Sequence, residues 1–197
     1  SSILKGKLYA NDTGEVMPRL FVAIDFPETT KDGILSLQEY DLPPGRWPQR
    51  EAIHLTLHFI GNVPEGVAAA YERVWDAVDV PPCELTIAGV GQFPIEDRPK
   101  VIWAGVDNTP ELRALHEAVG EALEEEGFIR EKRRYHPHIT LMRFKKPIRR
   151  GLSSTWIRDH IDFVLDPFTV TQFALYESEL TSEGAVYTKR AVYDLTE

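Results

Sequence analysis

The hydrophobic and polar positions of the chain alternate in short blocks that predict strands, and helical periods separate these blocks. Residues 19–25 form an apolar run typical of a buried strand, and residues 27–39 have the pattern of a helix. The same order starts again at residues 101–107 and continues through a helix that ends before Gly127. The pattern β-α-β-α-β therefore occurs twice, with one extra strand, which indicates an internal duplication.

The other expected elements complete the two halves: strands at residues 54–60, 84–90, 138–144, 168–177 and 185–193, and helices at 65–78 and 153–160. We expect an α+β fold in which two pseudo-symmetric lobes with mixed or antiparallel sheets flank a central cleft. Residues 1–17 show no strong periodicity, and we interpret them as an N-terminal extension or an added segment. Residues 18–197 should form one bilobal domain, with lobes of about 18–95 and 96–197 that exchange strands.

One tetrapeptide occurs in both halves, as His54-Leu55-Thr56-Leu57 (the first motif) and as His138-Ile139-Thr140-Leu141 (the second motif). Because successive side chains of a strand point to opposite faces, the histidine and threonine of each copy share one face. The same alternation adds His58 to that face in the first copy and Met142 in the second. A single His-x-Thr is common in structural strands, but chance explains two copies poorly. If the strands adjoin, two imidazoles and two hydroxyls form a site suited to acid–base chemistry at a phosphoryl group.

Composition excludes several classes of protein. The chain has 197 residues with 43% hydrophobic and 27% charged residues, as is ordinary for a globular protein. No apolar run approaches the ~20 residues that cross a bilayer, and no leader peptide is apparent. A single cysteine, Cys83, excludes an internal disulfide and any cysteine-based metal or redox motif. We therefore expect a cytoplasmic protein without membrane contact. Because both lobes lie in one chain, we also expect a monomer.

The charge is unevenly distributed along the chain. A net charge of −9 argues against broad binding of nucleic acid. Residues 130–150, however, contain nine lysines and arginines against one acidic residue, and the second motif lies within this segment. A charge run is often only a solvated face, but its coincidence with the motif favours a local anion site.

The chain resembles the 2H phosphoesterase superfamily, which is named for its two His-x-Thr/Ser motifs. Within that superfamily it is most similar to the RNA 2′,3′-cyclic phosphodiesterase family, also called 2′-5′ RNA ligases. The resemblance runs from about residue 18 to the end. Two departures are Arg134, where the family often has proline, and His58, where lysine or alanine is frequent. Besides the two motifs, the resemblance is carried by residues 19–25, 46–47, 58–61, 101–106, 133–137, 142–143, 175–180 and 184–187.

The resemblance implies hydrolysis of 2′,3′-cyclic phosphate ends of RNA to 2′-phosphates, without a metal or other cofactor. Ligation to a 2′-5′ bond would be the reverse chemistry of the same residues. The catalytic residues are then His54, His138, Thr56 and Thr140. We assign His54 as the acid that protonates the departing 3′ oxygen and His138 as the base that activates water. The two threonine hydroxyls would donate to the non-bridging oxygens.

Five further residues are candidates for binding the substrate. Arg133 and Arg143 flank the second motif, and a guanidinium can bind phosphate oxygens bidentately, although a surface position is the alternative for each. Phe21 and Tyr135 are candidates for stacking on a nucleobase, with core packing as an equally good explanation. His136 shares a strand face with the histidine of the second motif and would touch or flank the substrate.

Three other interpretations remain open. A related enzyme acting on a small cyclic nucleotide or on ADP-ribose cyclic phosphate would use the same four catalytic residues. A module that binds RNA ends without catalysis is a second possibility. The third is a zinc site, which would leave the repeated threonines unexplained. Its ligands would be the imidazoles of His54, His58, His136 and His138, whereas His116 and His160 are expected to be structural or exposed.

Overall fold

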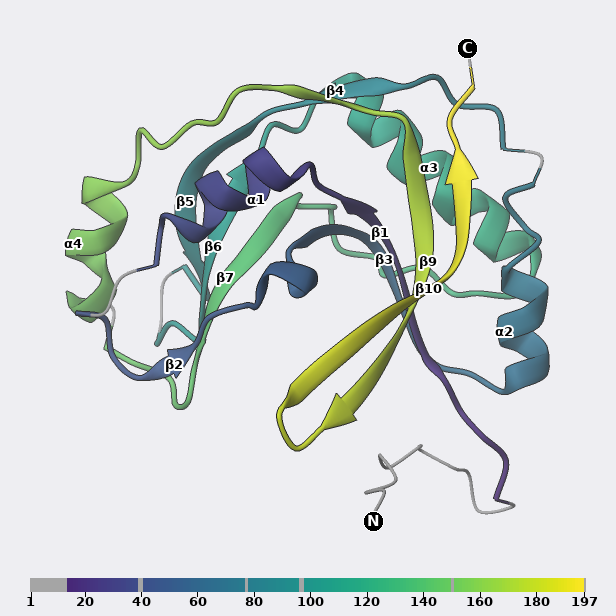
Figure 1. Ribbon diagram of the computed structural model, residues 1–197, viewed down its shortest axis with the longest axis horizontal. Coiled ribbons are helices and arrows are strands. Elements are labelled where there is room, and N and C mark those ends of the chain that lie inside the picture. Colours follow the sequence, from purple (N-terminus) through teal and green to yellow (C-terminus); the bar gives the residue numbers. More distant parts are fainter. Residues whose placement is uncertain (1–13, 39–40, 77, 96–97, 150, 197) are drawn as a thin grey trace.

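The computed structural model describes residues 14–38, 41–76, 78–95, 98–149 and 151–196. Most of the expected N-terminal extension lies outside these residues. The chain forms an α+β fold whose larger strands build two four-stranded sheets, with helices beside each of them (Figure 1). No helix in the described ranges combines the length and apolar character needed to span a membrane.

The first sheet has the strand order β10-β9-β1-β3 and is antiparallel throughout. Its strands β1 and β3 come from the first half of the chain, and β9 and β10 come from the second. The edge strand β3 carries the first motif. The four strands are β1 (Arg19–Asp25), β3 (His54–Asn62), β9 (Gln172–Thr181) and β10 (Gly184–Asp194).

The second sheet has the order β2-β7-β6-β5 and also mixes the two halves. Strand β7 carries the second motif, and the short β2 pairs only with its far end. A further two-stranded sheet joins β4 (Cys83–Leu85) to β8 (Phe168–Val170). The strands of the second sheet are β2 (Gly45–Arg46), β5 (Ile87–Phe93), β6 (Val101–Val106) and β7 (His138–Phe144).

The helices are α1 (Glu28–Leu35), α2 (Glu65–Tyr71), α3 (Pro110–Glu125), α4 (Gly151–Asp159) and the 3₁₀ turn η1 (Arg50–Ala52). Helix α3 begins as its sequence predicts, because the Thr109 hydroxyl accepts a hydrogen bond from the Leu112 amide and proline follows the cap. Although α3 belongs to the second half, it packs against β3 of the first sheet. Helix α2 is shorter than expected, because tight turns follow Tyr71 and carry the Trp75 indole inward to the Val119 carbonyl.

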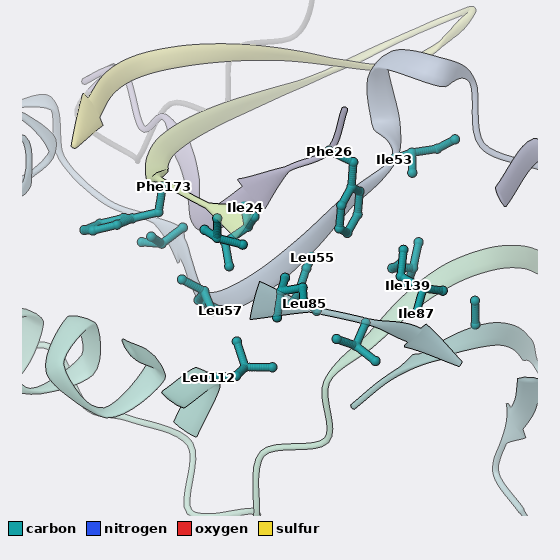
Figure 2. Packing of buried hydrophobic residues seen from close by; sticks show 14 of the residues in the cluster. Ile24, Phe26, Ile53, Leu55, Leu57, Leu85, Ile87, Leu112, Ile139 and Phe173 are labelled. Carbon is teal, nitrogen blue, oxygen red and sulfur yellow. The ribbon is translucent and has the colours of Figure 1, made fainter. Parts of the chain in front are cut away.

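One hydrophobic core joins the two sheets. Leu55 and Ile139, the second residues of the two motifs, are almost fully buried in the same cluster (Figure 2). Ile24, Leu85 and Leu112 contribute to this cluster from other elements. Each such side chain stabilises the fold by about 1.5–3 kcal/mol on burial. The strands that carry the catalytic candidates are therefore anchored in a shared core.

Each motif strand contains a β-bulge immediately after its threonine. In β3 the residues on either side of Leu57 pair with consecutive residues of β1. In β7 the residues on either side of Leu141 pair with consecutive residues of β6. Each leucine is thus one extra residue in its ladder, and the alternation of side chains is interrupted there.

The bulges correct two expectations from simple alternation. His58 and Met142 lie on the core side, 7% and 3% exposed, and do not share a face with the motif histidines. Phe59 and Arg143, the residues that follow them, are exposed instead. The bulge therefore exchanges the side chains that follow each motif between the two faces of the strand.

Candidate active site

The two motif histidines are held by the same local hydrogen bond. The Nδ1 atom of His138 lies 2.7 Å from the backbone oxygen of His136, and the ring of His54 hydrogen bonds to the backbone of Ala52. Because a carbonyl oxygen accepts, the ring nitrogen must donate. In neutral His138 this bond leaves Nε2 as an acceptor, the form that a general base requires. Each half therefore fixes the orientation of its own imidazole through a carbonyl two residues earlier.

Aromatic side chains of the first sheet surround His54. The centroid of the Phe21 ring lies 4.8 Å from that of His54 in a stacked arrangement, and those of Tyr187 and Tyr176 lie 5.4 and 6.0 Å away. Burial among these rings lowers the pKa of His54 to about 4, although the nearby carboxylate of Asp25 acts in the opposite direction. Without substrate, His54 is neutral at pH 7.

A second aromatic group surrounds His138. The ring of Phe93 approaches it edge-on at 5.1 Å, and Trp103 lies 6.3 Å away. Burial lowers the pKa of His138, and electrostatic interactions with His136 and Arg143 lower it further, whereas the hydrogen bond to the His136 carbonyl raises it. Both motif histidines therefore favour the uncharged form.

The two threonines are half-buried and lie opposite residues of the neighbouring strands, Thr56 opposite Ala23 and Thr140 opposite Trp103. Strands β3 and β7 contact each other. The Tyr135 hydroxyl also donates a hydrogen bond of 2.9 Å to the Thr56 carbonyl, and so links the segment before the second motif to the first motif. The structure thus brings the two motif strands, which belong to different sheets, into contact.

The substrate-binding candidates lie in different environments. Arg143 is exposed, and the bulge turns it away from the core, whereas Arg133 is 84% exposed and paired with Glu131. Phe21 is 4% exposed and packs on His54, which corresponds to the core-packing alternative. The ring of Tyr135 stacks on that of His116 of α3.

Some residues of the site were not singled out from the sequence. Tyr176 and Tyr187 pack around His54, and Phe93 around His138, but aromatic residues at strand positions are common in any core. Arg46 of β2 lies opposite Arg143 and adds a second guanidinium at that edge. Its proximity could not be read from the sequence, because the two residues come from opposite halves of the chain.

The four-imidazole zinc set of the alternative interpretation does not form. The bulge places His58 on the core side of β3, against His116 of α3 and on the face opposite His54. Among the residues that the structure describes, no three histidine, cysteine or acidic side chains are gathered as a set of metal ligands.

A cavity of about 410 Å³ lies beside the segment that precedes the second motif. Trp103, Asn108, Arg134 and His136 are among the residues that line it, and the rings of Trp103 and His136 lie 4.9 Å apart at its edge. Trp103 Nε1 and Asn108 Oδ1 are buried and have no hydrogen-bond partner within the described part of the chain.

The fold and the paired His-x-Thr strands are those of a 2H phosphoesterase, and comparison with known proteins agrees. Residues 27–181 match the model of the 2′-5′ RNA ligase superfamily. The chain therefore belongs to the 2′-5′ RNA ligase superfamily.

Individual relatives and solved structures give the same result. The RNA 2′,3′-cyclic phosphodiesterase of Aeropyrum pernix is 34% identical over 73% of this chain and 82% of its own length. The protein of the same name from Thermotoga maritima is 33% identical over 86% of this chain and 91% of its own length. Escherichia coli LigT complexed with 3′-AMP superposes with a TM-score of 0.71 at 28% identity, covering 92% of this chain and 99% of LigT.

Proposed function

We propose that this protein hydrolyses 2′,3′-cyclic phosphate ends of RNA to 2′-phosphates by two-histidine acid–base catalysis. The observation that carries the proposal is the matched pair of imidazoles on two contacting strands, each oriented by a backbone carbonyl. The names of the relatives support the reaction. The structures of E. coli LigT complexed with 3′-AMP and with phosphate support a phosphate-bearing ligand.

In the proposed reaction, Nε2 of His138 accepts a proton from water while the water oxygen bonds to phosphorus. The bond from phosphorus to the 3′ oxygen breaks, and His54 as imidazolium gives its proton to that oxygen. The products are a 2′-phosphate and a 3′-hydroxyl, and the proton taken from water replaces the one delivered. The hydroxyls of Thr56 and Thr140 stabilise the charge on the non-bridging oxygens, by about 2–4 kcal/mol each if they act as other oxyanion donors do.

The acid needs a proton that His54 does not hold in the empty site, where its pKa is about 4. The cyclic phosphate is an anion, and a negative charge beside an imidazole favours its protonated form. Substrate binding should therefore raise the pKa of His54, so that the imidazole is protonated when the reaction begins. Aromatic walls strengthen this coupling, because they exclude the water that would screen the two charges.

Residues beside the motifs would hold the rest of the substrate. Arg143 is exposed on β7 and lies opposite Arg46 of β2, where both guanidinium groups can reach phosphate oxygens. We place the nucleobase in the cavity that Trp103 lines, where the indole ring can stack on the base. His136 lines the same cavity and would contact the nucleoside. Arg133, Tyr135 and Phe21 remain predictions for direct substrate contact.

No step of this mechanism calls for a metal ion. Ligation follows from microscopic reversibility, because a 5′-hydroxyl in place of water would re-form the bond in the opposite direction. The same four residues would serve both directions, with the acid and base exchanging roles.

The test is chromatography of an RNA oligonucleotide ending in a 2′,3′-cyclic phosphate after incubation with protein in excess EDTA. Wild type should release the 2′-phosphate, whereas His54→Ala and His138→Ala should not. His160→Ala is the matched control, because the Nδ1 atom of His160 also lies 2.7 Å from a backbone oxygen, but His160 follows α4, stacks on Trp156 and is in neither motif strand. Loss of activity in EDTA would contradict the metal-free mechanism.

Substrate class is tested with the same proteins. A small 2′,3′-cyclic nucleotide and ADP-ribose cyclic phosphate should be turned over less efficiently than the RNA end. Faster conversion of either would favour the alternative enzyme. RNA that binds tightly to folded wild type but is never converted would indicate a binding module.

A further inference from the structure

The first motif lies on an open strand edge, and the second half of the chain supplies partners for it. Strand β3 ends the order of the first sheet, so carbonyl groups on its outer side have no neighbouring strand. The Tyr135 hydroxyl donates to the carbonyl of Thr56 at 2.9 Å, and the ring of His116 hydrogen bonds to the backbone of Leu57. Consecutive carbonyls of a regular strand point to opposite sides. The bulge at Leu57 interrupts that regularity and allows partners from one neighbouring region to reach both.

Three stacked rings connect these contacts. The ring of Tyr135 lies 3.8 Å from that of His116 at an interplanar angle of 15°, and His116 lies 4.1 Å from His58 at 23°. Nε2 of His58 in turn donates to the backbone oxygen of His116 at 2.7 Å. The ring column, defined as Tyr135, His116 and His58, therefore joins the segment before β7, helix α3 and strand β3.

A glycine of α3 makes room for this column. A Cβ atom at Gly120 would lie 2.8 Å from the His58 ring and 2.6 Å from the Arg130 side chain, both closer than packed atoms approach. Arg130 closes the same side and pairs with Glu117 and Glu124 at 2.8 Å. Burial lowers the pKa of His116 to about 4 and also lowers that of His58, so the column is uncharged at neutral pH.

We propose that Tyr135 and His116 are positioning residues, which hold the bulge after Thr56 in fixed register with the second motif. Tyr135 lies only three residues before His138, so its hydrogen bond to the Thr56 backbone ties one catalytic pair to the other. Neither residue needs to touch the substrate. The consequence for catalysis rests on the proposed function, whereas the mechanical role does not.

The test compares two tyrosines that make the same hydrogen bond in different places. The Tyr193 hydroxyl donates to the Glu72 carbonyl at 2.7 Å, in a region formed by Trp75 and Phe173. Tyr135→Phe and Tyr193→Phe each remove one hydroxyl and should lower thermal stability by similar amounts. Only Tyr135→Phe should lower kcat on the cyclic-phosphate RNA, by about 10- to 100-fold with little change in KM, as expected for a misplaced catalytic group.

Hydrogen exchange gives a readout that needs no turnover. Amides of β3 should exchange faster in Tyr135→Phe than in wild type or in Tyr193→Phe, because only that variant frees the bulge. His116→Phe keeps a ring in the column but removes its hydrogen bond, and it should change kcat and exchange in the same direction. Wild-type kcat and wild-type exchange in Tyr135→Phe would overturn the positioning role. Wild type that is inactive on the RNA would overturn the proposed function, and exchange alone would then decide the role of Tyr135.

Discussion

The two motif strands share one backbone design but present different chemistry. Each has a histidine held by the carbonyl two residues earlier, a threonine, and a bulge at the following leucine. Beyond the bulge, the first copy exposes Phe59 and the second exposes Arg143. The backbone design determines where the catalytic groups lie, while the residue after the bulge differs: Phe59 lies 4.7 Å below the guanidinium of Arg19, and Arg143 carries its own charge.

The surroundings of the two motif histidines also differ. His54 lies in an aromatic group with Phe21 and Tyr176, and burial lowers its pKa to about 4. His138 lies near the exposed His136 and within electrostatic reach of Arg143. The surroundings of His54, which we call the dry wall of the site, therefore hold an imidazole that needs an anion to become charged. The surroundings of His138, which we call the basic wall, can attract that anion.

Removing either motif imidazole should have the largest effect on the rate of the reaction. His54→Ala and His138→Ala should each lower kcat by about 10²–10⁴-fold, the usual contribution of one acid or base. The double variant should lose little more than either single variant, because the two groups act as a unit. Single-turnover rates on cyclic-phosphate RNA measure this. Full additivity would show that the two walls act independently.

Removing a positive charge from the basic wall should have the next largest effect, on substrate binding. Arg143→Ala should raise KM by about 10- to 100-fold, because a hydrogen bond to a charged group contributes about 1.5–3 kcal/mol. Arg158→Ala on α4 is the control, since Arg158 is 72% exposed and lies outside the motif strands. Steady-state kinetics at two salt concentrations would check the result. Equal effects of the two substitutions would mean that Arg143 acts only through the overall charge of the protein and does not contact the phosphate.

The pH profile should separate the empty site from the occupied one. Because the pKa values of both motif histidines lie below 6.5 in the free protein, kcat/KM should have its maximum on the acidic side of 6.5. The maximum of kcat should lie at higher pH, because bound phosphate raises the pKa of His54. Coincident profiles for kcat and kcat/KM would contradict substrate-induced protonation.

Removing an aromatic ring from the dry wall should change the pKa of His54 alone. Phe21→Ala removes the ring stacked on His54 and admits water, so the pKa of His54 should rise from about 4 toward 6.5. The pKa of His138 should stay the same, since Phe21 belongs to the other wall. Chemical shifts of the imidazole protons during a pH titration measure both values.

Stability should show the smallest effect. In the folded protein the pKa values of His54 and His116 are depressed to about 4. The unfolded chain therefore binds more protons between about pH 4 and 6.5, and the free energy of unfolding should fall as pH drops through that window. His116→Asn should lessen this dependence. Urea titrations at pH 7 and pH 5 would reveal it.

The sequence predicted the parts of the fold that depend on local pattern. The strand at residues 19–25, the capped helix that starts at Pro110 and the α+β class are confirmed. The bulges could not be predicted, because an extra residue is defined only against a partner strand. His116 was expected to be structural or exposed. Its contact with Tyr135 depends on α3 crossing to the first sheet, which no short-range pattern contains.

The mixed origin of the two sheets has a consequence for how the molecule moves. Each sheet takes strands from both halves of the chain, and the motif strands share one core. Neither half can then complete a sheet alone, so a chain divided between β5 and β6 should yield two fragments that remain unfolded until they recombine. The halves also cannot swing apart on a hinge as two independent bodies. The whole molecule should therefore unfold as one cooperative unit.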